Sequence, residues 1–139
     1  MKSRHPILLL FLLTCILSCK KFIEQQERKA VLNIITNGKW YVSQYQQNDS
    51  DITAAFSGYL FKFDENGVVT GSKDGVSQKG LWVTDVGART VSASFLTAGP
   101  PINLLNETWK ITDSYTDRVV ANSKDTVNHT SNILQLRKQ

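Results

Sequence analysis

The chain has 139 residues, with 16 lysines and arginines against 12 aspartates and glutamates, a formal charge of +4. This length is typical of one domain. A hydrophobic fraction of 41% with three tryptophans excludes a disordered chain, and two cysteines are too few for a disulfide scaffold. From Thr36 onward ten basic residues stand against ten acidic ones. Because binding to nucleic-acid phosphates needs a concentrated basic surface, we expect no nucleic acid as a partner.

The first residues have the organisation of a cleavable leader. Lys2 and Arg4 precede an apolar run, 7–17, of 11 residues, whereas a membrane-spanning helix needs about 20. The run therefore predicts a signal peptide over 1–18. Residues 16–19, Ile-Leu-Ser-Cys, resemble a bacterial lipobox, with an aliphatic residue at position −3, a small one at −1 and then the cysteine that receives lipid. The alternative is an ordinary secretory signal with incidental cysteines.

Lipidation of Cys19 would attach the chain to a membrane. We expect cleavage before Cys19 and a diacylglyceryl thioether on its sulfur. Several acyl chains, each stabilised by about 0.8 kcal/mol per buried CH₂, hold a protein stably on a membrane surface. After cleavage Cys19 is the only thiol of the chain, so no intramolecular disulfide can form.

Residues 19–36 are predicted to form the lipidated tether and an N-terminal helix. From residue 22 the segment contains neither glycine nor proline, and Val31, Ile34 and Ile35 recur at helical spacing. The pattern predicts a helix over 24–36, ended by the Asn-Gly pair that follows. Because the apolar stripe lies in the last turns, we expect these turns to dock on the folded body while the start of the helix leads to the lipid.

Beyond this helix the pattern changes to the two-residue period of β-strands. Eight short runs rich in valine, isoleucine, threonine and aromatic residues are predicted strands: 38–46, 57–64, 67–73, 76–84, 89–95, 105–113, 117–123 and 132–138. Asn-Gly and Asp-Gly turns between them supply the positive φ that antiparallel hairpins require. The spacing predicts an all-β domain over 37–139: an eight-stranded antiparallel up-and-down barrel, in which closure removes exposed sheet edges.

The phase of the predicted strands indicates one shared core. Alternate side chains of a strand point to opposite faces, and in each case one face is apolar. The predicted inward sets are Tyr59, Phe61 and Phe63; Val91, Ala93 and Phe95; Trp109 and Ile111; and Leu134 and Leu136.

Several motifs stand at characteristic places of this barrel. They are Gly-Lys-Trp at 38–40, the hairpin 61–67, Gly-Leu-Trp at 80–82, Trp-Lys-Ile at 109–111 and Leu-Gln-Leu at 134–136. With them, residues 30–139 resemble the lipocalin superfamily, and more narrowly the lipocalin-like lipoproteins of Bacteroidetes-type bacteria. The resemblance implies that Trp40 plugs the closed end of the barrel.

The same resemblance bears on location. Bacteria of this kind often use acidic residues just after the lipidated cysteine to export lipoproteins to the surface, and Lys20-Lys21-Phe22 lacks them. We therefore expect a protein of the bacterial cell envelope, lipid-anchored to the outer membrane on its periplasmic face rather than on the cell surface.

A barrel of eight strands can be filled by side chains or can hold one small ligand. The predicted pocket combines apolar walls with polar groups that orient a small apolar or amphipathic ligand. The walls are Tyr59, Phe61 and Phe95, and the orienting groups are Gln44, Gln78 and Glu107. A carboxylate inside an apolar barrel must be paired, protonated or hydrated, because a bare buried charge costs several kcal/mol. The alternative places the three polar residues near the barrel ends in water, around a filled centre.

Catalysis finds little support in the sequence. After Cys19 the single histidine is His129, in a predicted loop, with no partner histidine for a metal and no second thiol as a nucleophile. We expect no enzymatic activity, no metal and no cofactor. Two other hypotheses stay open: an interaction module that contacts envelope proteins through loops 49–57 or 97–103, and hydrolysis around His129.

Overall fold

The structure is a computed structural model that describes residues 6–125 and 129–139. In these residues one α-helix, α1 (Pro6–Thr36), precedes nine β-strands, and two short 3-10 helices lie in connections, η1 (Thr53–Phe56) and η2 (Ile102–Leu105). The strands are β1 (Trp40–Gln47), β2 (Ser50–Asp51), β3 (Leu60–Phe63), β4 (Val68–Lys73), β5 (Val76–Asp85), β6 (Thr90–Ser94), β7 (Thr108–Ser114), β8 (Arg118–Asp125) and β9 (Thr130–Lys138).

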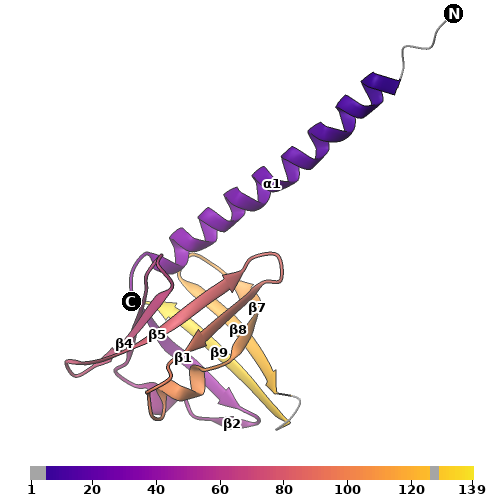
Figure 1. Cartoon of the computed structure of the whole chain (residues 1–139). Coiled ribbons are helices and arrows are strands. Elements are labelled where there is room, and N and C mark those ends of the chain that lie inside the picture. Colours follow the sequence, from indigo (N-terminus) through magenta and orange to yellow (C-terminus); the bar gives the residue numbers. More distant parts are fainter. Residues whose placement is uncertain (1–5, 126–128) are drawn as a thin grey trace, which may run out of the picture.

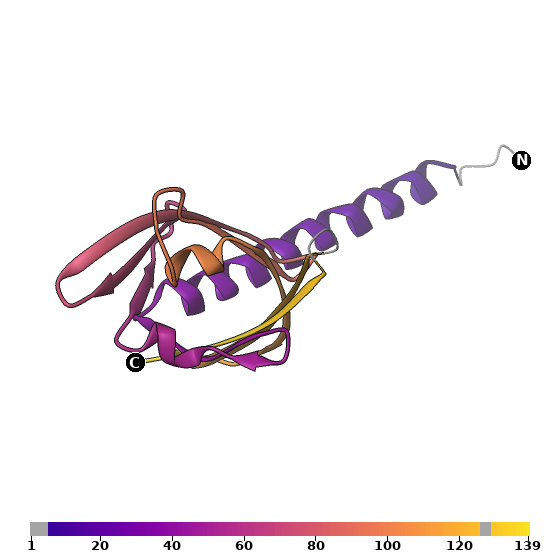
Figure 2. The same cartoon turned by 90° about the horizontal axis from the view of Figure 1, so that it is seen from below.

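The strands form a closed antiparallel barrel, and Figure 2 shows them as a ring seen from one end. From β3 to β9 each strand pairs with the next. β1 closes the ring through seven residue pairs with β9, from Trp40–Lys138 to Gln47–Asn132, and through the single pair Trp40–Phe61 with β3. β2 only extends the far end of β1. The predicted all-β fold, an eight-stranded antiparallel barrel with an N-terminal helix, is confirmed.

Helix α1 is longer than predicted, because it begins at Pro6 and not at residue 24. Proline is favoured at the first helical position, and the leucine-rich segment after it has a high helix propensity. The exposed segment 21–30 is here called the stalk. The last turns of α1 pack on the barrel core through Leu32, Ile34 and Ile35, as the apolar stripe predicts.

Two hydrogen bonds fix the end of α1 to the barrel. The indole N–H of Trp40 donates to the carbonyl of Ile35 at 2.9 Å. The Lys62 ammonium donates to the carbonyl of Thr36, where a cation is favoured by the negative end of the helix dipole. The chain then turns at Gly38, whose φ is +93°. The two hydrogen bonds connect the helix to β1 and β3.

The two ends of the barrel differ (Figure 1). The end of α1 and the β3–β4, β5–β6 and β7–β8 turns lie at one end, where α1 leaves the barrel. The other end, here called the mouth end, carries η1, η2 and the β4–β5 turn. Across the described parts of the chain, no helix combines the length and the apolar character that crossing a bilayer requires.

The core is aromatic, and each tryptophan also makes a polar contact outside the sheet. Trp40, Trp82 and Trp109 are 1%, 6% and 3% exposed. Their indole N–H groups donate to carbonyls in α1, in the β3–β4 turn and in η2, at 2.9, 2.9 and 3.2 Å. Each therefore buries a large apolar surface without leaving its donor unpaired.

Substitution of Gly80 by alanine should destabilise the barrel by about 1–3 kcal/mol, the usual cost of overpacking a core. A Cβ at Gly80 would lie 2.6 Å from the carbonyl oxygen of Ser94 and 2.7 Å from the ring of Phe95. The control is Gly99→Ala, because a Cβ there meets nothing within 4 Å. The urea concentration at the midpoint of unfolding should fall strongly for Gly80→Ala and little for Gly99→Ala. Equal midpoints for the two variants would contradict the close packing of Phe95 on β5.

Candidate functional site

The barrel interior contains a narrow cavity of ≈ 70 Å³. Its lining is apolar apart from the indole N–H groups of Trp40 and Trp109, which already donate to backbone carbonyls. The other lining residues are Ile35, Phe61, Phe63, Val69, Val91, Ala93, Phe95, Leu105, Ile111, Val119, Ala121, Leu134 and Leu136. Such a lining offers water no hydrogen-bond partners. The cavity is far below the roughly 300–1,000 Å³ of pockets that enclose drug-sized ligands.

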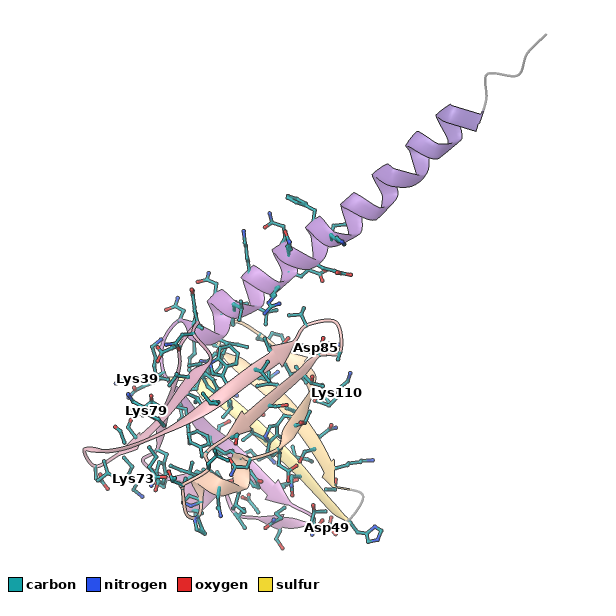
Figure 3. All side chains as sticks on the ribbon, viewed as in Figure 1. Lys39, Asp49, Lys73, Lys79, Asp85 and Lys110 are labelled. Atoms are coloured by element: carbon teal, nitrogen blue, oxygen red, sulfur yellow. The ribbon has the colours of Figure 1, made fainter. Side chains whose placement is uncertain are left out.

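A larger pocket of ≈ 290 Å³, here called the mouth pocket, lies on the inner face of the β4–β5 hairpin. It is lined by Tyr59, Gly71, Lys73, Asp74, Val76, Gln78 and Ile102. Strand register explains this set, because Gly71 pairs with Gln78 and Lys73 with Val76, and residues two apart share a face. Figure 3 shows Lys73 at the end of the barrel remote from α1, and Lys39 on the side nearer α1.

Gly71 forms the floor of the mouth pocket because it lacks a side chain. A Cβ at this position would lie 3.0 Å from the ring of Phe61 and 3.3 Å from Ile102. Ile102 comes from η2 and lines the mouth pocket, whereas Phe61 lines the apolar cavity. Both side chains are at most 2% exposed. They therefore separate the mouth pocket from the cavity.

Lys73, Asp74 and Gln78 are the charged and amide side chains that line the mouth pocket. The Nζ atom of Lys73 lies 5.2 Å from the centroid of the Tyr59 ring, a cation–π arrangement. Among the described residues, neither Lys73 nor Asp74 forms an ion pair. The Oε1 atom of Gln78 is buried and has no hydrogen-bond partner among the residues that the structure describes. A buried acceptor without a partner costs about 1–3 kcal/mol in a folded protein. The pocket thus offers one cation, one anion and one buried acceptor.

The structure distributes the six predicted ligand-binding residues over different places. Tyr59 and Gln78 lie together in the mouth pocket. Phe61 and Phe95 line the apolar cavity. The other two, Gln44 and Glu107, line neither. The single predicted pocket is therefore two spaces, one apolar and one polar.

Gln44 does not point into the barrel, and this prediction is wrong. A β-bulge between Val42 and Gln44 shifts the register of β1 against β9. Val42 and Tyr45, 6% and 0% exposed, both belong to the core. Because a bulge adds one residue to a strand, it inverts the phase of the side chains beyond it. The inward position assigned to Gln44 is occupied by Tyr45.

Glu107 precedes β7 instead of lying within a strand, because η2 occupies the start of the predicted run. Its backbone N–H donates to the carbonyl of Leu105 at 2.8 Å, and its half-buried carboxylate interacts with Tyr45. Burial, followed by the charge of Glu107, raises the pKa of Tyr45 to about 12. The Tyr45 hydroxyl donates to the carbonyl of Leu104 at 2.8 Å. Glu107 therefore acts on a core phenol and not on the mouth pocket.

Two buried polar residues lie elsewhere on the inner face. Asn132 and Ser123 are 2% and 3% exposed, and the Asn132 amide donates to the Ser123 hydroxyl at 3.3 Å. The Oδ1 atom of Asn132 has no partner among the described residues. Asn132 was not predicted to be buried, although its phase matches that of the inward residues Leu134 and Leu136.

The mouth pocket contains residues that the sequence analysis missed. Lys73 could have been found by phase, because it lies two and four residues beyond Gly71 and Val69, which are both buried. Asp74 stands in the predicted Asp-Gly turn, but nothing in the turn indicates a pocket. Ile102 reaches the pocket only because η2 folds over the mouth end, and its sequence carries no signal for this.

Residues considered for other roles lie away from the mouth pocket. Trp40, the predicted plug, lies at the α1 end of the barrel and is 1% exposed. His129 is exposed, with a φ of +53°. In the described ranges no three histidine, cysteine, aspartate or glutamate side chains cluster closely enough to hold a metal ion.

The fold has a counterpart among solved structures. The chain is similar to the crystal structure of a DUF4847 family protein from Bacteroides vulgatus ATCC 8482, with a TM-score of 0.56 and 18% sequence identity. The match covers 78% of this chain and 99% of the other. No family model and no curated protein matches the chain. At this identity the similarity concerns the fold, and the function has to be inferred from the site.

The raised pKa of Tyr45 predicts a stability that falls at high pH. The folded pKa of about 12 exceeds the ordinary value of 10.0, so the contribution is complete below pH 10 and is lost as the pH rises towards 12. The loss is at most about 1.4 kcal/mol per pH unit.

This dependence can be measured by urea unfolding of the wild type and of Tyr45→Phe between pH 9 and pH 11. The variant lacks the hydroxyl, so the difference between the two free energies of unfolding should shrink above pH 10. Tyr115→Phe is the control, because Tyr115 is 54% exposed. A difference that stays constant with pH for Tyr45→Phe would contradict the proposed effect of burial.

Proposed function

We propose that this chain is a lipid-anchored lipoprotein of a bacterial cell envelope, without enzymatic activity, whose lipocalin-like barrel binds a small amphipathic ligand at the mouth end. The observation that carries the binding proposal is the mouth pocket. Gln78, whose Oε1 has no hydrogen-bond partner among the described residues, lines this pocket together with the apolar side chain of Ile102 and the ring of Tyr59. Small-ligand sites commonly combine apolar walls with a few convergent polar groups.

The anchor proposal is supported by the lipobox-like segment before Cys19 and by the geometry of α1. The stalk is exposed along its whole length. Because its side chains are not buried against the barrel, it can serve as a spacer. At about 1.5 Å per residue, residues 19–30 would hold the barrel roughly 18 Å from the lipidated residue. The absence of acidic residues directly after Cys19 favours the periplasmic face of the outer membrane.

A second candidate function is a protein-interaction module of the envelope. The narrow cavity of ≈ 70 Å³ leaves little room for a ligand in the barrel centre. On the outer face of β5, Leu81 and Val83 are 63% and 65% exposed, and exposed apolar groups of this kind can contact a partner protein. This candidate gains support if no small molecule binds at the mouth end.

Lipidation can be tested by the intact mass of the protein purified from the membranes of a Bacteroidetes host. We expect residues 19–139 with added acyl groups for the wild type and for Cys15→Ser. Cys19→Ser removes the thiol that accepts lipid and should leave an unlipidated chain outside the lipoprotein fraction. A wild-type mass equal to unmodified residues 19–139 would contradict the anchor.

Ligand binding can be tested with 3-phenylpropan-1-ol, a small neutral amphipathic probe, by ligand-observed NMR titration of the protein in lipid nanodiscs with empty nanodiscs as the blank. Gln78→Leu should weaken binding by about fivefold, the equivalent of one hydrogen bond. Gln44→Leu is the matched control, because Gln44 lies outside both spaces, and it should bind like the wild type. Absence of saturable binding by the wild type would contradict the proposed function.

A further inference from the structure

The charged groups of the mouth pocket indicate more than an amphipathic ligand. From them we infer that the pocket takes a small water-soluble zwitterion with an apolar side chain, such as a free amino acid, with its carboxylate at Lys73 and its ammonium at Gln78 and Asp74. This inference rests on the proposed ligand-binding function and specifies its ligand.

Lys73 supplies the position for the carboxylate. Its ammonium is held over the ring of Tyr59, and its stem passes beside Gly58, where a built Cβ would lie 3.4 Å from Cε of Lys73. These contacts restrict the side chain before any ligand arrives, which lowers the entropic cost of binding. Lys73 is the one cationic residue of the pocket lining.

Gln78 and Asp74 supply the position for the ammonium. The Oε1 atom of Gln78 is buried without a donor, and the carboxylate of Asp74 lines the same pocket without an ion pair among the described residues. An ammonium group has three donors and no acceptor, so it suits a pocket lined by a carboxylate and an amide side chain. A ligand with a carboxylate alone would leave the Gln78 oxygen unpaired.

Val76, Ile102 and Tyr59 form the apolar part of the pocket. They would contact the side chain of the zwitterion, and the pocket volume of ≈ 290 Å³ limits the ligand to a small molecule. The hairpin that carries Lys73 lies at the end of the barrel remote from α1. With the lipid on Cys19, just before the stalk, the mouth pocket faces away from the membrane. Its ligand therefore comes from the aqueous phase rather than from the bilayer.

The test compares four probes that share a phenyl group on a short carbon chain, titrated against the protein in lipid nanodiscs. They are phenylalanine, 3-phenylpropanoate without the ammonium, 2-phenylethylamine without the carboxylate, and the neutral 3-phenylpropan-1-ol. We expect phenylalanine to bind at least about tenfold more tightly than any of the other three, since each lost charged contact costs a comparable factor. Phosphatidylethanolamine added to the nanodiscs, a bilayer source of an ammonium head group, should not displace it.

Variants assign each charge to its residue. Lys73→Met should weaken the binding of phenylalanine and of 3-phenylpropanoate and leave the affinity for 2-phenylethylamine unchanged. Gln78→Leu and Asp74→Asn should each weaken the binding of phenylalanine and of 2-phenylethylamine and leave the affinity for 3-phenylpropanoate unchanged. Lys79→Met is the matched control, because Lys79 is exposed on the opposite face of β5 from Gln78, and it should bind all probes like the wild type.

The outcomes separate the two proposals. If the neutral probe binds as well as phenylalanine and the variants at Lys73 and Asp74 have no effect, the zwitterion is wrong while the amphipathic site stands. Displacement of phenylalanine by phosphatidylethanolamine would overturn the aqueous source. If no probe binds to the wild type, the proposed binding function itself fails.

Discussion

The pairing of β1 with β9 is the interaction on which the rest of this structure depends. Seven residue pairs join the first strand to the last, whereas β1 meets β3 at a single pair. Without the β9 pairing, β1 and β9 would each present an open edge, and the inner face of the sheet would open to water. The same strand begins at Trp40, whose indole holds the end of α1. Strand β1 therefore takes part both in barrel closure and in the attachment of the helix.

Closure also explains why the polar and apolar spaces are distinct. Side chains from all sides fill the barrel centre and leave a narrow cavity. The β4–β5 hairpin projects sideways from the ring (Figure 2), and Lys73 and Gln78 lie on its inner face near the turn. Lys73 is only partly buried there, so water or a ligand can reach its side chain. Because Gly71 has no side chain, Phe61 and Ile102 both approach its backbone closely, and they lie between the cavity and the mouth pocket.

The sequence predicted much of the fold and part of the site. The two-residue period and the Asn-Gly and Asp-Gly turns correctly indicated eight barrel strands, because both are local properties of the chain. Phase placed Tyr59 and Gln78 on the same face, and the structure brings them into one pocket. Gln44 was placed wrongly because the β-bulge of β1 forms in its pairing with β9. No residue type in β1 predicts a bulge at this position.

The sequence by itself determined the strands, their turns and the docking face of α1, since each depends on residues near one another in the chain. The anchor at Cys19 stays a prediction from the sequence. Only the tertiary structure decided that η2 would carry Ile102 across the mouth end, that Glu107 would raise the pKa of Tyr45, and that Lys73 would share a pocket with Tyr59. These pairs come from segments distant in sequence. Their contacts exist only after the barrel has closed, because closure sets which side chains meet and how much water stays between them.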